Sequence, residues 1–256
     1  MIKRKTAREI EMMRRAAGIA AAARQIAGDL VRVGATTHSI DKKVHGYILS
    51  RGAVPAFLGY NGFPASVCVS VNEQVIHGIP SSRKLIDGDI VSIDVGAVKG
   101  GFVGDCAATF IAGEGSQEAK RLIEVTRQCF YEGLKFARVG YRVSDISRAI
   151  QNYAEGKGYS LVREYVGHGI GTKMHESPEV PNFVQIPRKK ADPRLMPGMT
   201  LAVEPMVNAG IPDIKILNDG WTVVTADGKN SAHYENTILI TEGEPEILTV
   251  CGENES

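Results

Sequence analysis

Hydrophobic residues near the start of the chain recur at helical spacing. One face of this segment collects the apolar positions Ile10, Met13, Ala17, Ala20 and Ala21. Because Thr6 and Glu9 fit a capping box in front of them, the pattern predicts an amphipathic helix. The segment is also basic and rich in alanine, as a signal peptide can be, but its apolar run at 16–23 is short and bracketed by arginines. A helix of the folded protein is therefore the better interpretation.

The rest of the pattern alternates helices with strands. Periodic apolar positions predict three further helices, at 37–49, 118–138 and 144–157. Alternating or continuous apolar runs predict two groups of strands, the first at 66–71, 90–97 and 102–111 and the second at 200–207, 221–225 and 233–241. Lys99, Gly100 and Gly101 form the predicted turn of a hairpin in the first group. These elements predict an α+β protein.

One spacing of residues occurs twice in the chain. Leucine, two residues, glycine and five residues end in an acidic residue both times, with His-Gly-Ile before the acid and a second acid after it. The repeated positions are His77, Asp94 and Asp105 in the first copy and His168, Glu204 and Glu235 in the second. The duplication predicts two lobes related by an approximate twofold axis, about 1–157 and 158–256, with the acids meeting at the seam.

Acidic side chains that meet at a seam need cations. Two carboxylates about 4 Å apart repel by roughly 4 kcal/mol at an effective dielectric constant near 20. Carboxylate oxygens with one imidazole suit Mn, Fe, Co or Zn, and two such ions about 3.5 to 4 Å apart are typical of hydrolases. The alternative is that these acids are separate surface residues, but the repeat and the apolar flanks, such as Ile93 and Val203, argue against it.

Composition and charge fit one compact enzyme. The chain has 256 residues, of which 43% are hydrophobic, enough for a large core within a single domain spanning 1–256. A net charge of +1 provides no field to attract nucleic acid or an anionic membrane, and we predict neither partner. The four cysteines show no CxxC spacing, so a reducing compartment, the cytoplasm, is the simpler interpretation.

Five sequence strings together resemble the type I methionine aminopeptidases of bacteria. They are VNEQVIHGIP, DIVSIDVGAVKGGFVGDCAATF, GHGIG followed by MHESP, PGMTLAVEP and SAHYENTILIT, and the resemblance runs from about residue 5 to 248. It implies the pita-bread fold, in which two related lobes with curved antiparallel sheets are flanked by helices. It also implies a monomer that removes the initiator methionine from nascent polypeptides when the second residue is small. Hydroxide activated by two divalent ions would attack the peptide bond.

The resemblance also implies roles for the repeated residues. Asp94 and Asp105 would hold one ion with Glu235, while His168 and Glu204 would join Asp105 and Glu235 around the other. Glu204 is our candidate for the general base. His175 would lie beside the scissile carbonyl oxygen and His77 beside the amide nitrogen of the second residue. His233 lies two residues before Glu235 and would share its face on a regular strand, so it could support the ligands, although many relatives carry Gln there.

A methionine pocket would be apolar and polarisable. The family likeness assigns it to Tyr60, Phe63, Cys68 and Trp221 with His77 and His175, and with Phe57 and Met174 nearby. Met174, Phe63 and Phe57 stand where Phe, Tyr and Cys are common in relatives, so pocket shape and inhibitor preference are open. Asn72, Gln74 and Ser231 match positions that hold a monovalent cation in some relatives, and such a cation is a possibility here.

Two other interpretations compete. A prolidase shares the fold and a similar ligand set, but such enzymes usually add a large N-terminal domain. A non-catalytic protein of the same fold would have lost its ligands, whereas all five positions and both extra histidines are present. The basic segment 181–197, with Arg188, Lys189, Lys190 and Arg194, is predicted to be a solvated loop. Transient contact of this loop with the ribosome is an open possibility.

Overall fold

The computed structural model describes residues 2–184 and 192–251. Its helices are α1 (Ala7–Asp29), α2 (Thr37–Ser50), α3 (Gln117–Leu134), α4 (Val143–Gly156) and the short 3-10 helix η1 (Tyr60–Gly62). The capping box of α1 is present, since the Thr6 side chain accepts from the Glu9 backbone and the Glu9 carboxylate accepts from the Thr6 backbone. The predicted helices are confirmed, except that α3 ends at Leu134 rather than at 138.

The strands form one large antiparallel sheet and two small ones. The first part of the chain gives β1 (Val54–Pro55), β2 (Val67–Val71), β3 (Gln74–Ile76), β4 (Ile90–Lys99) and β5 (Phe102–Ile111). The later strands are β6 (Ser160–Leu161), β7 (Gly167–Gly169), β8 (Glu176–Val180), β9 (Thr200–Val203), β10 (Met206–Asn208), β11 (Ile214–Ile216), β12 (Val223–Thr225), β13 (Ser231–His233), β14 (Glu235–Leu239) and β15 (Glu246–Ile247).

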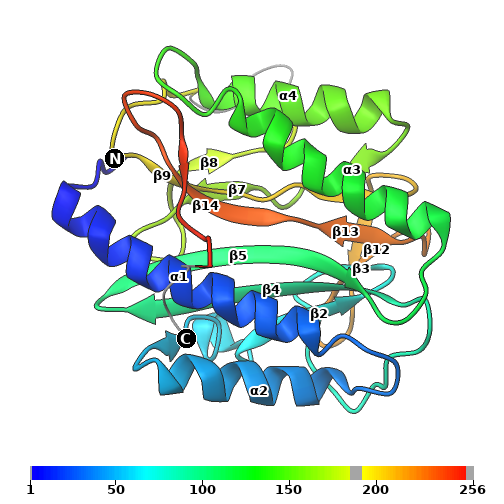
Figure 1. The fold of residues 1–256 in the computed structure, drawn as a ribbon. Helices are drawn as coiled ribbons and strands as arrows, with labels where there is room; N and C mark the ends of the chain where they lie inside the picture. Colours follow the sequence, from blue (N-terminus) through cyan, green and yellow to red (C-terminus); the bar gives the residue numbers. More distant parts are fainter. Residues whose placement is uncertain (1, 185–191, 252–256) are drawn as a thin grey trace.

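The strand order of the large sheet shows the predicted twofold relation between the two repeats. The path runs β1-β4-β5-β14-β9-β7-β8, with β2 paired to β4 and β15 paired to β14. The central strands β4 and β5 of the first repeat therefore correspond to β9 and β14 of the second, and β5 and β14 meet at the seam (Figure 1). The small sheets, β13-β10-β6 and β11-β12-β3, extend the second half beside it.

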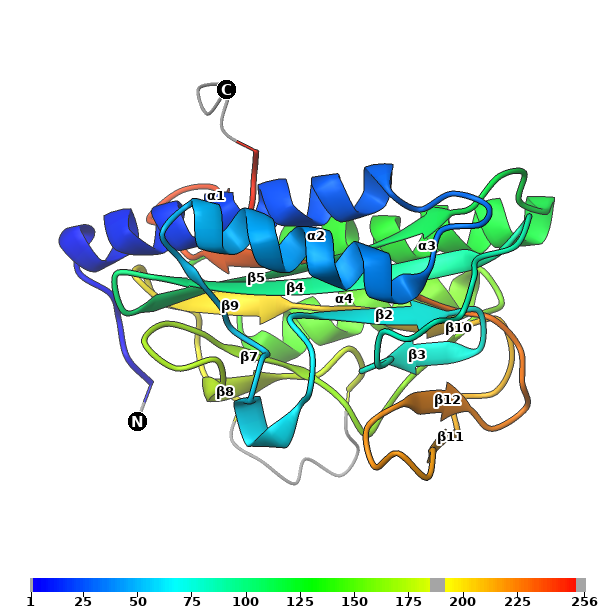
Figure 2. The ribbon, with the colours of Figure 1, turned by 90° about the horizontal axis from the view of Figure 1, so that it is seen from below.

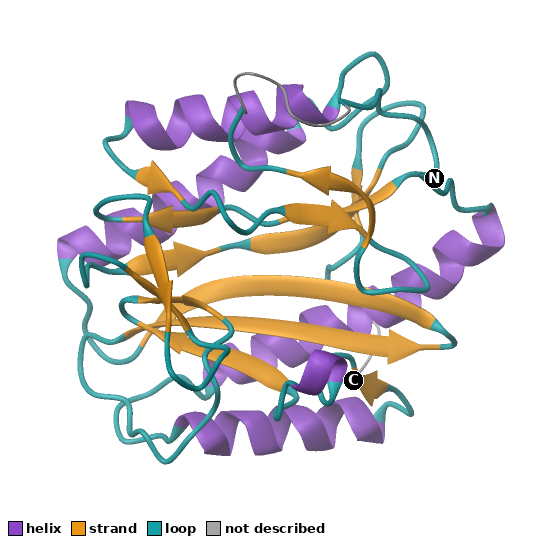
Figure 3. Ribbon diagram, turned by 180° about the vertical axis from the view of Figure 1, so that it is seen from behind, coloured by secondary structure: helices purple, strands orange, loops and turns teal. Residues whose placement is uncertain are grey.

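The helices cover one face of the large sheet. Figure 2 shows α1 and α2 above β4 and β2, and Figure 3 shows the opposite face with its strands in front of the helices. Buried residues of α1 and α2 pack with those of β2 and β4, whereas α3 and α4 pack with β9, β10 and β14. By packing, α3 and α4 therefore belong with the second half of the sheet, not with the first lobe of 1–157 in which the sequence placed them.

The two long strands expected in the second half are interrupted. The segment 200–207 divides into β9 and β10 at Glu204 and Pro205, and 233–241 divides into β13 and β14 at Tyr234. At the first point the chain passes from the large sheet to the β13-β10-β6 sheet, and at the second it returns from that sheet to the large one. The Tyr234 N–H donates to the Pro205 carbonyl at 3.2 Å and joins the two crossings. These crossings place Glu204 and Glu235 where the two sheets meet.

Candidate active site

Two aspartates of the β4–β5 hairpin share one face of the large sheet. Asp94 lies opposite Ala107 and Asp105 lies opposite Gly96, so the acids are diagonal neighbours rather than directly opposed. The hairpin was predicted correctly and its register follows from the Lys99–Phe102 pair at the turn. Gly96 lets the Phe57 ring pack closely against this face, because a Cβ there would lie only 2.7 Å from Phe57 Cε1. The sheet thus presents both carboxylates on one face, beside the ring of Phe57.

The second half of the sheet brings two more acids and a histidine to the same place. Glu235 begins β14 and pairs with Ala107 of β5, Glu204 follows β9, and His168 lies in the middle of β7. His168 Nδ1 lies 2.9 Å from the Gly169 carbonyl oxygen. Since a carbonyl only accepts, Nδ1 carries the proton and leaves the Nε2 lone pair available. This Nε2 lies 3.5 Å from Glu204 Oε1.

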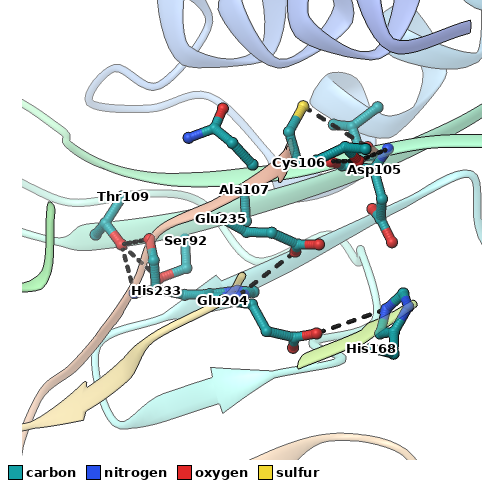
Figure 4. A network of polar contacts seen from close by, with 12 residues as sticks. Ser92, Asp105, Cys106, Ala107, Thr109, His168, Glu204, His233 and Glu235 are labelled. Atoms are coloured by element: carbon teal, nitrogen blue, oxygen red, sulfur yellow. Dashed lines mark hydrogen bonds and ion pairs between the residues drawn. The ribbon is translucent and has the colours of Figure 1, made fainter. Parts of the chain in front are cut away.

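As the sequence predicted, the structure brings together the five candidate ligands, Asp94, Asp105, His168, Glu204 and Glu235. Figure 4 shows Asp105, Glu204, Glu235 and His168 around a common space. Potential ligand atoms of Asp105, His168 and Glu235 all lie within 4.8 Å of one another. A second group with the same separation consists of Asp94, Glu235 and His233. The two groups overlap because they share Glu235.

Burial dominates the electrostatics of the acids. It raises the pKa of Asp94 to about 7. Burial first, and then the neighbouring carboxylates, also raise the pKa values of Asp105, Glu204 and Glu235 well above the usual range. Asp94 Oδ1, Asp105 Oδ1 and Glu235 Oε1 are buried and have no hydrogen-bond partner among the described residues. Oxygen atoms left in this state fit divalent cations, which would remove the repulsion that raises these pKa values.

The nearby histidines are held neutral. Burial lowers the pKa values of His77 and His168 to about 4, with a smaller contribution from His175 in both cases. Burial lowers the pKa of His233 to about 3 and also lowers the pKa of His175. Neutral imidazoles can coordinate a cation or donate an N–H to a developing oxyanion. The site therefore combines acids that repel one another with histidines that do not add positive charge.

A cavity of about 270 Å³ opens beside the acids. Its lining includes all five repeated-motif ligand positions and every predicted pocket residue, namely Tyr60, Phe63, Cys68, His77, Met174, His175 and Trp221. Phe57 contributes as well, whereas Asn61, Ile76, Tyr165 and Val166 were missed by the sequence analysis. Tyr165 stands three residues before His168, and this proximity is the one signal that could have indicated it. Its ring lies edge-on to His77, with centroids 5.4 Å apart.

Local structure holds His77 and His175 over this cavity. His77 adopts a left-handed backbone with φ of 58° after β3, and Trp221 lies edge-on to its ring. His175 precedes β8, and its Nδ1 lies 2.7 Å from the Tyr60 hydroxyl. The next residue, Glu176, accepts from Lys5 Nζ at 2.8 Å in a pair whose side chains are 6% and 9% exposed. The N-terminal segment thus fixes the loop that carries His175.

The possible cation positions are also brought together. The Ser231 N–H donates to the Asn72 carbonyl oxygen at 2.9 Å, and Asn72 has a left-handed backbone with φ of 59°. Gln74 lies two residues further on, and its side-chain oxygen accepts from Val71 N. A monovalent cation at these positions stays a prediction.

Part of the basic segment 181–197 is not described. Three of its basic residues, Arg188, Lys189 and Lys190, lie outside the described residues. The backbone of Arg194 pairs with that of Arg142 in an isolated antiparallel β-bridge. Contact of this segment with the ribosome therefore stays a prediction. None of the described helices combines the length and apolar character needed to cross a bilayer.

Comparisons with known proteins agree on a family. The model of metallopeptidase family M24 matches residues 11–242. The chain is 52% identical to a methionine aminopeptidase of Clostridium perfringens over 98% of this chain and 99% of that protein. It is 51% identical to methionine aminopeptidase 1 of Bacillus subtilis, over 97% of this chain and 99% of that protein.

Solved structures show the same likeness. A methionine aminopeptidase of Thermotoga maritima superimposes with a TM-score of 0.92 at 43% identity, covering 97% of this chain and 99% of that one. A prolidase of Pyrococcus furiosus shares the fold, with a TM-score of 0.79 at 22% identity, but this chain covers only 66% of it. The chain therefore belongs to metallopeptidase family M24 and, within it, to the bacterial type I methionine aminopeptidases.

Proposed function

We propose that the protein removes the N-terminal methionine from polypeptides whose second residue is small, by hydrolysis at a centre of two divalent metal ions. The observation that carries this proposal is the shared cavity, in which buried acids and His168 adjoin an apolar pocket of aromatic and sulfur side chains. Such a pocket suits an unbranched, polarisable methionine side chain. The likeness to methionine aminopeptidases over nearly the full chain supports the same activity.

The donor set suits two ions. Asp94, Asp105 and Glu235 would hold one of them, and His168 and Glu204 would hold the other together with Asp105 and Glu235. Bound divalent ions, whether Co, Mn, Fe or Zn, would supply Lewis-acid polarisation of the carbonyl and lower the pKa of water in the site. Because Asp105 and Glu235 lie on the adjacent central strands β5 and β14, they are suited to bridge.

The protein's own groups would handle the protons and the developing charge. Glu204, which lies within 3.5 Å of His168, would take a proton from the attacking water and pass it to the leaving nitrogen. His175, oriented by the Tyr60 hydroxyl, would donate to the oxyanion. His77 would lie at the amide nitrogen of the second residue. The rings of Tyr165 and Trp221 lie edge-on to His77, so a bulky second residue beside His77 would meet them.

A peptide panel tests this function. With divalent metal added, the purified full chain is expected to release methionine from Met-Ala-Ser at least about 100-fold faster than from Met-Leu-Ser, because bulk beside His77 displaces the scissile carbonyl and a shift near 1 Å can cost about that factor. N-acetyl-Met-Ala-Ser is the control with the same scissile bond but no free amine, and we expect no cleavage. Preferential cleavage of Gly-Pro would overturn the proposal in favour of a prolidase.

Metal affinity is expected to depend on pH. In the metal-free protein the pKa of Asp94 is raised to about 7, so below that pH a proton must leave before the carboxylate can bind. His168, with a pKa lowered to about 4, stays neutral in this window. Calorimetric titration with Mn(II) should show proton release and weaker binding at about pH 6 than at about pH 8, with cleavage activity falling in parallel. Affinity that is unchanged between these pH values would contradict the ligand assignment.

Location, assembly and partners are further predictions of this function. Nascent polypeptides are the natural source of initiator methionine, so we place the protein in the cytoplasm. It would act as a monomer, with transient contact to the ribosome as the open possibility.

A further inference from the structure

His233 is a buried histidine without a polar partner. It ends β13, two residues before Glu235, and is 2% exposed. Its Nδ1 and Nε2 are both buried without a hydrogen-bond partner within residues 2–184 and 192–251. Nε2 lies 3.7 Å from Glu235 Oε2, which is too long for a hydrogen bond (Figure 4). The imidazole therefore points its nitrogen toward a ligand carboxylate without bonding to it.

The backbone fixes His233 in this position. Its N–H donates to Thr109 Oγ1 at 2.9 Å, and the same hydroxyl donates to the His233 carbonyl at 2.9 Å. Met206 of β10 pairs with it on the other side. A buried polar group without a hydrogen-bond partner destabilises the folded protein. A residue that only filled space here would be more stable as an apolar side chain, so both ring nitrogens indicate a missing partner.

The neighbours of His233 identify the class of that partner. Ligand atoms of Asp94, Glu235 and His233 lie within 4.8 Å of one another, and Asp94 Oδ1 and Glu235 Oε1 are also buried without partners among the described residues. Two carboxylates and a neutral imidazole around one point form a ligand set for a divalent metal ion. The group made by Asp105, Glu235 and His168 has the same composition.

We propose that His233 supplies a nitrogen ligand to the ion held by Asp94 and Glu235, so that each ion of the pair has one imidazole. This inference rests on the proposed two-metal centre and adds His233 as a sixth residue to its five proposed ligands. Imidazole favours Zn, Co and Fe over harder ions such as Mg. A glutamine at this position would present an amide oxygen instead and would shift the preference of that ion toward harder metals.

The variants His233→Gln and His233→Ala test this ligand directly. His38→Gln is the matched control, because His38 is exposed on α2 and far in sequence from every acid of the site. Each protein is loaded with two equivalents of Co(II), and X-ray absorption measures the imidazole scattering per ion. We expect both His233 variants to lose about half of the imidazole signal, since His168 is the other imidazole ligand, while the control retains it all.

Competition with a chromophoric chelator gives a second measurement. One of the two Co(II) ions should bind at least about tenfold more weakly in the His233 variants, whereas the other should be unchanged. If the imidazole signal of His233→Gln equals that of the wild type, the inference is overturned, even if affinity falls. A residue that only supports the ligands, without binding the ion, would lower the affinity but leave the imidazole signal unchanged. Circular dichroism shows whether each variant is folded. If one of the two His233 variants is misfolded, the other one tests the inference.

Asp105→Ala separates this inference from the proposed function. If Asp105→Ala loses metal while His233→Gln keeps both ions and the full imidazole signal, only the role of His233 is wrong. If Asp105→Ala also keeps two ions, the metal centre itself is wrong.

Discussion

Asp105→Ala is expected to lose bound metal and peptide cleavage together. Asp105 is 4% exposed, and burial and neighbouring acids raise the pKa of its carboxyl well above the usual range. Its backbone is held independently of the side chain, because its N–H donates to Thr237 Oγ1 at 3.2 Å and its carbonyl accepts from that hydroxyl at 2.9 Å. The variant should therefore fold, and removing one of several repelling acids should not destabilise the metal-free protein.

Metal analysis and initial rates on Met-Ala-Ser measure this outcome. A residue that only supports a ligand typically costs about 10- to 100-fold, so a ligand shared by two ions should cost more than about 100-fold in activity. Asp213→Ala, which removes an exposed aspartate before β11, is the control and should keep both metal and rate. In the wild type, exhaustive chelation should abolish cleavage, and added Co(II) or Mn(II) should restore it. Full activity of protein shown to be free of metal would refute the metal centre.

Local signals in the sequence predicted the first half of the fold well. The capping box at Thr6 and Glu9 defined the start of α1, and the glycines at 100 and 101 defined the β4–β5 turn. Both depend on hydrogen bonds and backbone angles within a few residues. The repeated spacing also predicted that two acids from each half meet, since equivalent strands of a duplicated unit occupy equivalent places in the sheet.

Features that depend on residues far apart in the chain were harder to predict from the sequence. The interruption at Pro205 follows from its missing N–H, but where the chain then goes depends on β13, almost 30 residues later. The same holds for α3 and α4, whose apolar faces could cover either half of the sheet until β9 and β14 are in place. Tyr165 reaches the site because the chain passes there from β6 of a small sheet to β7 of the large one, and no periodicity within its own segment indicates that change of sheet. The strand spacing placed His233 beside Glu235, but it did not predict that the two residues belong to different sheets.

His175→Ala is expected to keep its metal and lose most of its turnover. His175 is not in either group of potential ligand atoms, but its ring lies 4.3 Å from that of His168 and lines the cavity. A lost oxyanion contact lowers kcat by about 10² to 10³, and a lost proton-transfer group by about 10² to 10⁴. Tyr60→Phe is the graded comparison: it removes the 2.7 Å contact that orients the ring but leaves the imidazole, so its loss should be smaller.

His77→Asn is expected to behave like His175→Ala, and asparagine is preferred to alanine for a structural reason. The left-handed backbone of His77, with φ of 58°, disfavours most residues, and asparagine tolerates it best after glycine. This choice separates the lost imidazole from a rearranged loop. Metal content should equal that of the wild type in both variants, and kcat should fall by about 10² to 10⁴. Near-normal kcat in His175→Ala would show that the oxyanion is stabilised without it, and metal loss in either variant would show that the histidine supports the ligands instead of the substrate.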